Sequence, residues 1–433
     1  MVSDREKPAK IYVRNYGCAS NIADGETISG CLSKSGYRIV SDEEEASVLI
    51  YNTCAVKTQT ENKVINALKN VPKDKRLVVT GCLPLINLER LSKEISWHGV
   101  TGPSPGLRIV DVVDGIIRGE KFTLLDNDQK PSLALPHRES SRVVKIVPAC
   151  YGCLGTCTYC CVRFARGPLR SYTIEEIVDS LKEAVKRGFR EIWLTAQDLA
   201  CYGRDIDTDL VELLHEMDDV DGDFHVRLGM INPANVVPIL HELMNVFRSK
   251  RFFKFLHLPI QSGDDTVLKD MHRQYTAKII REIVADIRER IGQFTLATDV
   301  IYGFPTETDD AFKNSLSLLR DMKPDIINVS RFFPRPGTPA SELAQLPLSA
   351  INDRSRALSR LSVETSVDRN REWVGWHGEV IVDERKHPDS LISRNFAYKP
   401  IAIKTEEDLL GKIAFVRVTG YHSSYLNGVL VHF

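Results

Sequence analysis

The alternation of short apolar strands with amphipathic helices is the feature that most restricts how this chain can fold. Strand-like segments lie at residues 10–16, 47–52, 76–80 and 97–101, with helix-like segments at residues 20–34, 58–70 and 105–119. This order predicts a parallel sheet with helices on its faces. We therefore expect an N-terminal α/β domain over residues 1–125, with Ser20 or Asn21 capping its first helix. Residues 126–142 are polar, contain two prolines and predict a linker.

A second stretch of the same character follows, and it predicts a central domain over residues 143–368. Its six strand candidates begin near Val143, Glu191, His225, Phe252, Thr295 and Ile326. Six units are too few for a closed eight-stranded barrel, so an open, partial (β/α)6 barrel fits better. A long charged helix at residues 351–372 leads out of it. Residues 373–433 contain short strands between polar turns and predict a small all-β barrel.

Composition narrows the range of partners and compartments. The 433 residues favour about three domains. The chain has 57 Lys and Arg against 58 Asp and Glu, so a nucleic acid must be held by a local patch of charge. No apolar run approaches 18 residues and the N-terminus is charged, so we expect a cytoplasmic protein with no membrane span. Ten cysteines in a reducing compartment indicate metal binding or catalysis rather than disulfides.

Residues 150–161 read CYGCLGTCTYCC and contain the spacing Cys153-x3-Cys157-x2-Cys160. Three thiolates on one loop hold three corners of a cubane [4Fe–4S] cluster and leave the fourth iron free for a substrate. A loop at the C-terminal end of a barrel strand is where such folds place their reactive centre. The alternative is a zinc site built from Cys150 and Cys153 with Cys157 and Cys160. Its central gap is much shorter than that of a zinc ribbon.

This spacing, with Tyr159 before the last cysteine, resembles the radical S-adenosylmethionine (SAM) superfamily. The resemblance extends to the methylthiotransferase family over nearly the whole chain. The segments that carry it are CTYCCVRFARG, LTAQDLACYGRD (194–205), RLGMINP (227–233), LHLPIQSG (256–263), ATDVIYGFPTET (297–308) and RFFPRPGTPA (331–340).

A second group of cysteines lies in the N-terminal domain. Cys18, Cys54 and Cys82 each come just after a predicted strand. Because the ends of parallel strands meet at one edge of a sheet, the three thiols converge there. Zinc would need a fourth ligand, and no histidine is adjacent to any of them. The alternative is three unrelated core residues. The segments NYGCASN, NTCAVK and TGCLP resemble the auxiliary-cluster motifs of methylthiotransferases, which implies a second [4Fe–4S] cluster.

The resemblance also implies contacts to SAM. The backbone near Tyr159 meets the adenine, and Ile301 and Gly303 belong to a pattern, ending at Glu307, that the superfamily uses near that ring. Gln197, Asp198 and Arg227 are candidates for the methionine or ribose end, since a buried arginine at a strand end usually pairs with a carboxylate. His257 and Gln261 are candidates for the mouth of the site. The alternative for Ile301 and Gly303 is an ordinary strand and turn, and the alternative for Arg227 is a structural salt bridge. The alternative for His257 and Gln261 is a core position whose hydrogen bonds are satisfied within the fold.

The remaining cysteines and a run of arginines have simpler interpretations. Cys31 lies inside a predicted helix and Cys150 and Cys161 flank the triad, so core packing is the first expectation for each. Cys201 is a candidate for the mouth of the site. Arg163, Arg166 and Arg170 form a basic run beside the cluster loop, and either a solvated face or a phosphate contact fits it.

The small C-terminal barrel resembles the RNA-binding TRAM domain of the family. Residues 373–433 carry as many acidic as basic residues, so bulk charge gives no indication of RNA binding. The segment Arg394-Asn395-Phe396-Ala397-Tyr398-Lys399 combines cations with aromatic rings, which suits stacking on an unpaired base. We expect RNA contacts from Arg394, Asn395, Tyr398 and Lys399, although a small barrel also needs such rings for its core.

The segments NYGCASNIADGE and VRLGMINP are most similar to the archaeal and eukaryotic branch of the family. That branch acts on N6-threonylcarbamoyladenosine at position 37 of tRNA. One SAM donates a methyl group to sulfur at the auxiliary cluster. A second is cleaved at the Cys153, Cys157 and Cys160 cluster, and the 5′-deoxyadenosyl radical takes hydrogen from C2 of the adenine.

The expected partners are the tRNA anticodon loop, an electron donor such as flavodoxin or ferredoxin, and a sulfur source. Two alternatives have the same chemistry on isopentenyladenosine in tRNA or on a ribosomal-protein aspartate. A third, of another class, is a non-catalytic, zinc-stabilised RNA-binding protein.

Overall fold

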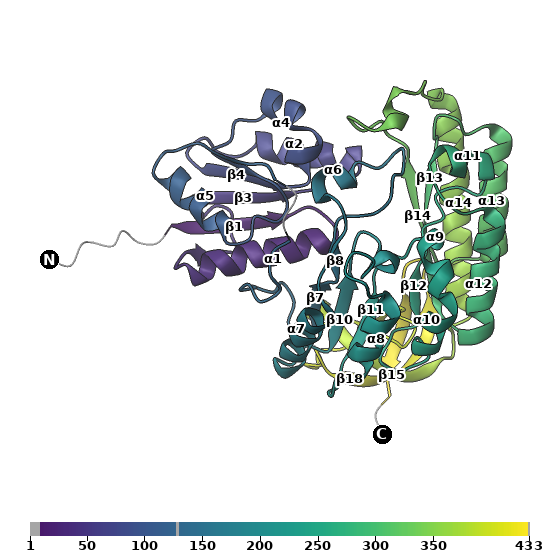
Figure 1. Cartoon of the computed structure of the whole chain (residues 1–433). Coiled ribbons are helices and arrows are strands. Elements are labelled where there is room, and N and C mark those ends of the chain that lie inside the picture. Colours follow the sequence, from purple (N-terminus) through teal and green to yellow (C-terminus); the bar gives the residue numbers. More distant parts are fainter. Residues whose placement is uncertain (1–8, 127–129, 432–433) are drawn as a thin grey trace.

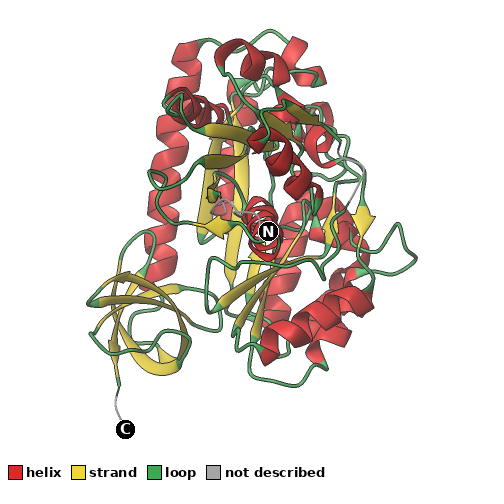
Figure 2. Ribbon diagram, turned by 90° about the vertical axis from the view of Figure 1, so that its left-hand side faces the viewer, coloured by secondary structure: helices red, strands yellow, loops and turns green. Residues whose placement is uncertain are grey.

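The computed structural model describes residues 9–126 and 130–431. It has an α/β N-terminal unit, an open parallel barrel and a closed all-β barrel, in that order (Figure 1). The closed barrel lies at one end of the molecule and is seen as a separate unit in Figure 2. This is the fold class that the sequence predicts. No helix of the described residues is long and apolar enough to cross a membrane.

The N-terminal unit is a parallel six-stranded sheet with strand order β2-β1-β3-β4-β5-β6. The strands are β1 (Lys10–Asn15), β2 (Arg38–Ile39), β3 (Val48–Thr53), β4 (Arg76–Gly81), β5 (Gly99–Thr101) and β6 (Phe122–Leu124). One apolar layer packs α1 (Ala19–Lys34) and α5 (Arg108–Ile117) on the sheet, and a second packs α2 (Thr58–Lys69), α3 (Leu83–Ile86) and α4 (Leu88–Glu94) on the other face. The two short edge strands were not predicted, because they lack a sustained apolar pattern.

The central unit is an open barrel of six parallel strands. They are β7 (Val144–Pro148), β10 (Glu191–Thr195), β11 (His225–Leu228), β12 (Phe255–His257), β13 (Thr295–Tyr302) and β14 (Ile326–Arg331). Backbone hydrogen bonds pair them as two sheets of three, and parallel bridges from Val226 to Phe252 and from Met230 to His257 join the two. Its outer helices are α7 (Ile174–Lys186), α8 (Leu210–Asp218), α10 (Leu240–Val246), α12 (Ala277–Ile291) and α13 (Asp309–Met322). The predicted strand starts agree with the structure except at Phe252, which precedes its strand.

The long helix α14 (Leu348–Arg371) packs along β14 and leads to the closed barrel. That barrel has strand order β15-β16-β17-β19-β18. Its strands are β15 (His377–His387), β16 (Ser390–Arg394), β17 (Pro400–Lys404), β18 (Ile413–Tyr421) and β19 (Leu426–Leu430). The predicted last strand ran to residue 433, and residues 432–433 lie outside the described part. A five-stranded closed barrel of this size is consistent with a TRAM-like domain.

Candidate functional site

Cys18, Cys54 and Cys82 lie at the carboxyl ends of β1, β3 and β4, at one edge of the N-terminal sheet. Cys18 is the N-cap residue of α1, and its side chain makes no capping hydrogen bond. The prediction that Ser20 or Asn21 caps this helix is wrong, because both residues lie inside it. Cys82 begins α3 in the same way. The structure therefore brings together the three thiols that the sequence singled out.

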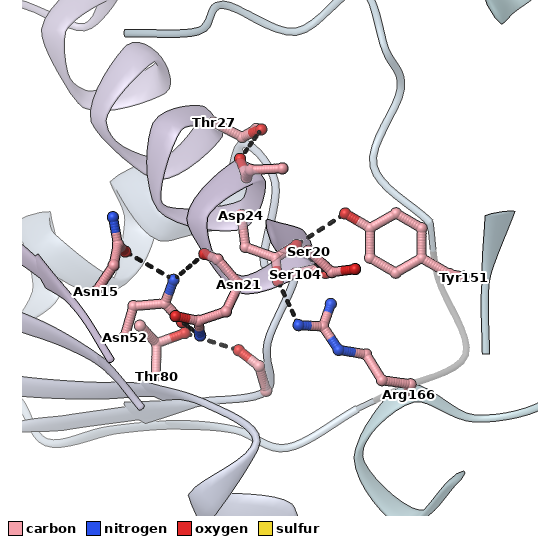
Figure 3. Close-up of polar contacts among 12 residues, drawn as sticks. Asn15, Ser20, Asn21, Asp24, Thr27, Asn52, Thr80, Ser104, Tyr151 and Arg166 are labelled. Atoms are coloured by element: carbon pink, nitrogen blue, oxygen red, sulfur yellow. Dashed lines mark hydrogen bonds and ion pairs between the residues drawn. The ribbon is translucent and has the colours of Figure 1, made fainter. Parts of the chain in front are cut away.

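An asparagine network holds these strand ends in place (Figure 3). The Asn52 side-chain amide donates to Asn15 Oδ1 at 2.9 Å and to the Asn21 carbonyl at 2.6 Å, and Asn21 donates back to Asn52 Oδ1 at 2.7 Å. Gly81 has a φ of +98°, and a Cβ there would meet the Thr53 carbonyl oxygen at 2.2 Å. Only glycine allows β3 and β4 to come this close, which sets Cys82 beside the Cys54 loop.

The second cysteine group lies on the loop between β8 (Cys150–Tyr151) and α6 (Val162–Arg166). The Cys153 thiol accepts a hydrogen bond from the Gly155 amide at 3.2 Å, and the Cys160 amide donates to the Cys157 carbonyl at 3.1 Å. The Thr158 amide donates to the Met271 carbonyl, and the Thr158 carbonyl accepts from Ala340. The loop is thus fixed from both sides, and the ligand positions are organised in advance.

Burial raises the pKa of several of these thiols. The pKa is about 12 for Cys82, about 11 for Cys153 and about 12 for Cys160. These thiols are protonated in the metal-free chain, and binding of iron would release the protons. Among the described residues, no group of three or more His, Cys, Asp or Glu side chains is arranged to hold a single metal ion.

Three buried polar atoms near the cysteine groups lack a hydrogen-bond partner in the described part of the chain. They are Arg166 Nη1, Asn21 Oδ1 and Gln197 Oε1. Unpaired buried polar groups are costly and rare in native proteins. Together with two sets of three thiols, they fit sites that are completed by bound charged groups.

The cysteines outside the two triads are buried. Cys150 and Cys201 lie in the barrel core, where a hydrogen bond with Cys201 and burial raise the pKa of Cys150. Cys201 donates to the Asp198 carbonyl at 3.0 Å, so it does not line the mouth of the site. Cys161 packs in the core of the N-terminal unit beside the Ala55 carbonyl, and Cys31 is a core residue of α1.

The predicted adenine contacts share one apolar cluster. Tyr159 and Ile301 both pack against a group that includes Phe304 and Phe332. Gly303 has a φ of +75°, and its amide donates to Glu307 Oε2 at 2.8 Å. Glu307 is buried and paired with Arg354 at 2.8 Å, so it holds the turn rather than facing the site. At the same barrel end, His257 and Asp299 form a 2.9 Å pair, and Gln261 has a φ of +63°.

The three polar candidates for SAM have different environments. Gln197 donates to Ser20 Oγ at 3.3 Å, which places it between the two units. Asp198 is 2% exposed and its carboxylate accepts from Ala200, Asn232 and Asn235, so it organises the loop. Arg227 stacks on Trp193, Phe255 and Tyr398 toward the C-terminal barrel. The structure gives no support to a SAM contact by Asp198 or Arg227.

The prediction for the C-terminal loop needs a correction. Asn395, Tyr398 and Lys399 are buried. Lys399 Nζ donates to Asp325 at 2.8 Å and to Asn370 at 2.7 Å, and Tyr398 donates to Glu191 at 2.5 Å. Arg394 pairs with Asp383 at 2.7 Å and covers the Tyr398 ring. Tyr398 and Lys399 thus form the domain interface with buried charges of the central barrel, whereas Arg394 and Asn395 are held within the C-terminal barrel itself.

Arg273 and Arg166 were missed as parts of the site. Arg273 Nη1 donates to Cys157 Sγ at 3.4 Å and also lines a cleft of about 580 Å³ beside the loop. Arg166, placed by the sequence in a surface run, is 2% exposed and paired with Asp24 at 2.7 Å. A lone arginine in a helical or loop segment carries no local signal of such a contact, so the sequence alone could not identify either one.

Comparisons with known proteins agree with this arrangement. One family model, described as Uncharacterized protein family UPF0004, matches residues 10–102, and the Radical SAM superfamily model matches residues 147–319. A probable threonylcarbamoyladenosine tRNA methylthiotransferase of Pyrococcus abyssi is 40% identical over 97% of this chain and 99% of its own length. The threonylcarbamoyladenosine tRNA methylthiotransferase of Xenopus laevis is 34% identical over 99% of this chain and 79% of its own length. The chain belongs to this methylthiotransferase family.

Solved structures show the same fold at low identity. The radical SAM methyltransferase TsrM of Kitasatospora setae has a TM-score of 0.56 at 14% identity, and the match covers 77% of this chain and 75% of TsrM. Family membership confirms the prediction of a radical SAM transferase with [4Fe–4S] clusters and SAM as cofactors. It does not favour the non-catalytic zinc protein.

Proposed function

We propose that this protein converts N6-threonylcarbamoyladenosine at position 37 of tRNA to its 2-methylthio derivative, using two [4Fe–4S] clusters and two SAM per turnover. The names of full-length relatives in archaea and animals support the substrate. The observation that carries the chemistry is structural. One set of three cysteines lies at the carboxyl ends of β1, β3 and β4, and the other lies on the loop before α6, the helix that packs against α3.

Cys153, Cys157 and Cys160 would hold the cluster that binds SAM, and Cys18, Cys54 and Cys82 would hold the auxiliary cluster. When bound, the first supplies the electron that cleaves SAM, and the second supplies the site for sulfur. The chain itself positions the groups. Tyr159, Ile301 and Gly303 offer an apolar slot and a close backbone approach for adenine. Gln197 is retained as a polar contact because its Oε1 is buried and unpaired among the described residues.

The two units meet through α6 and its neighbours. α6 packs against α3, Cys161 approaches the Ala55 carbonyl, and Gln197 contacts Ser20. Burial acts to raise the pKa of Asp299, but His257 and, more weakly, Asn328 and Lys57 of the N-terminal unit lower it. These contacts join the two units beside the cysteine groups.

The substrate would enter past exposed apolar side chains next to the cysteines. Val56, Leu154 and Phe164 are each at least two-fifths exposed, and each follows a cysteine segment. Such side chains suit an unpaired base of an anticodon loop. An electron donor such as flavodoxin or ferredoxin and a sulfur source complete the reaction.

Nucleoside mass analysis of tRNA tests the substrate. Cells that lack the gene should accumulate threonylcarbamoyladenosine and lose its 2-methylthio form. In vitro, the reconstituted chain should methylthiolate tRNA that carries threonylcarbamoyladenosine but not tRNA that carries isopentenyladenosine. Product only on the second tRNA, or only on a ribosomal-protein aspartate, would identify one of the alternatives instead.

Cys54→Ala tests the division of labour between the cysteine groups. SAM cleavage should persist, whereas methylthio transfer should be lost because the sulfur-bearing site is gone. Cys31→Ala is the matched control, since Cys31 is buried in the same unit but belongs to the core. Normal methylthio transfer by Cys54→Ala would show that this cysteine group is structural.

A further inference from the structure

Arg166 belongs to the radical SAM half of the chain but reaches the auxiliary cysteine edge. It ends α6, the short helix that directly follows the Cys153, Cys157 and Cys160 loop. Its guanidinium pairs with Asp24 of α1, whose carboxylate also accepts from Tyr151 at 2.7 Å and from Ser104 at 2.8 Å (Figure 3). Arg166 and Asp24 are each 2% exposed.

The ion pair with Asp24 leaves part of the Arg166 guanidinium without a hydrogen-bond partner. Arg166 Nη1 is buried and has no hydrogen-bond partner among residues 9–126 and 130–431. A buried arginine normally satisfies most of its five N–H donors, and an unmet one carries a desolvation cost. The unmet donor therefore indicates a group that binds at this place.

The neighbours of Arg166 identify the sign and location of that group. The helix that Arg166 ends packs against α3, which begins directly after Cys82. Ala165, the residue before Arg166, lies in the same apolar cluster as Cys82. The guanidinium is therefore carried to the cysteine edge by the packing of α6. Three thiolates at this edge carry more negative charge than a cubane core neutralises.

We propose that Arg166 is the cationic counter-group of the auxiliary cysteine site, supplied across the interface by the radical SAM half of the chain. The inference rests on the proposed auxiliary cluster but not on the identity of the tRNA substrate. Arg166 is a positioning residue: it stabilises the charge of the thiolate-bound cluster and raises its reduction potential. Asp24, Tyr151 and Ser104 hold its side chain in place.

The test uses the full chain in which Cys153, Cys157 and Cys160 are replaced by Ala, so that the remaining iron belongs to the auxiliary site. Arg166→Gln in this chain should shift the cluster potential, measured by EPR-monitored redox titration, to a more negative value. Iron loss to a ferrous chelator should become faster by about 10- to 100-fold, the usual effect of losing an outer-shell partner of a metal site. Arg166→Lys should restore part of both properties.

Two further variants separate this role from a structural one. Arg163→Gln, on the same helix but exposed, should leave the potential and the rate of iron loss unchanged. Asp24→Asn combined with Arg166→Gln removes both buried charges, so it should recover the melting temperature but not the potential or iron retention. If the double variant recovers all three, Arg166 serves only Asp24 and the proposal fails. An unchanged potential in Arg166→Gln would equally overturn it.

The outcome also separates this inference from the proposed function. A triple-alanine chain that binds no iron removes the auxiliary cluster and the inference together. A triple-alanine chain that binds iron there, beside a wild-type chain that never methylthiolates tRNA, leaves the inference intact and removes the proposed substrate.

Discussion

At the scale of single residues, Arg273 is the side chain whose contact with a predicted ligand is most direct. It donates to Cys157 Sγ at 3.4 Å and is held by Tyr275 Oη at 2.8 Å. Hydrogen bonds to cluster sulfurs raise the reduction potential and so ease transfer of an electron to the cluster. Arg273 therefore connects a cleft at the surface with the predicted SAM-cleaving site.

Arg273→Gln should slow reductive cleavage of SAM by about 10- to 100-fold, as loss of an outer-shell partner usually does. The rate of 5′-deoxyadenosine formation under dithionite measures this directly. Lys269→Gln is the control, because Lys269 lines the same cleft and makes no described contact with a cysteine. An equal loss in both variants would attribute the effect to the cleft and not to the thiol contact.

Local sequence was sufficient to single out six cysteines as candidate ligands, but it did not identify their charged neighbours. A cysteine directly after an apolar run is recognisable, and parallel pairing brings such positions together. Lys399 and Tyr398 have partners 74 and 207 residues away. Their burial depends on docking of a whole domain, which a composition of cations and rings does not encode. The same holds for Arg166 and Asp24.

At the scale of elements, the turn between β13 and α13 shows how the fold supports the adenine slot. Glu307 accepts from the Gly303 amide and pairs with the α14 residue Arg354 at 2.8 Å. Burial nevertheless raises the pKa of Glu307 to about 7. In the folded chain the Glu307 carboxyl therefore keeps its proton up to about pH 7, whereas in the unfolded chain it loses the proton near pH 4.5.

This difference predicts a pH dependence of stability. Between about pH 4.5 and 7 the folded state holds more protons than the unfolded state. The free energy of unfolding of the wild type therefore falls as pH rises through this window, by up to about 3 kcal/mol. Glu307→Gln should lose this contribution. Urea unfolding at pH 5 and at pH 8 should show the wild-type advantage over the variant shrinking. Parallel curves would place the pKa of Glu307 near its ordinary value.

The C-terminal barrel is fixed to the central barrel by a second buried group. Lys399 Nζ lies between Asp325 and Asn370, and it is only 3% exposed. Lys399→Met leaves Asp325 with a buried charge whose remaining ion pair among the described residues is with Arg369 at 3.4 Å. Loss of one partner of a buried pair typically costs about 3–5 kcal/mol.

We therefore expect Lys399→Met to lower the melting temperature while the salt dependence of tRNA binding stays as in wild type. Lys404→Met, on the exposed end of β17, is the matched control and should melt normally. A Lys399→Met chain that melts as wild type but binds tRNA with a flatter salt dependence would restore the RNA contact that the sequence suggested.

At the scale of the whole molecule, the order and type of elements followed from the sequence because each strand and helix carries its own periodicity. The open barrel was predictable from a count of strand candidates, and the closed one from short strands and turns. The relative placement of the units was not. It depends on buried ion pairs between segments that are remote in sequence, Arg166 with Asp24 and Arg335 with Glu61.

The second of these pairs predicts how the units cooperate. Arg335 follows β14 of the central barrel, and its Nη2 meets Glu61 Oε2 of α2 at 2.5 Å, with both side chains at most 5% exposed. Arg335 also reaches Thr58 at 3.2 Å and contacts Cys161, next to the last ligand of the radical SAM loop. The pair therefore ties the central barrel to α2 of the N-terminal unit beside the radical SAM loop.

Arg335→Met should lower the free energy of unfolding by about 3–5 kcal/mol, because Glu61 stays buried and loses one of its positively charged partners. Transfer of a methylthio group needs both sites at one substrate, whereas cleavage of SAM needs one. The variant should therefore keep SAM cleavage and lose methylthio transfer, which shows as 5′-deoxyadenosine formed without product. Arg90 also pairs with Glu61, but it is partly exposed and pairs with Glu94 as well. Arg90→Met should therefore have a smaller effect on both stability and coupling. If Arg335→Met loses cleavage and transfer in equal proportion, Arg335 supports the radical SAM loop alone and the spacing of the two units is set elsewhere.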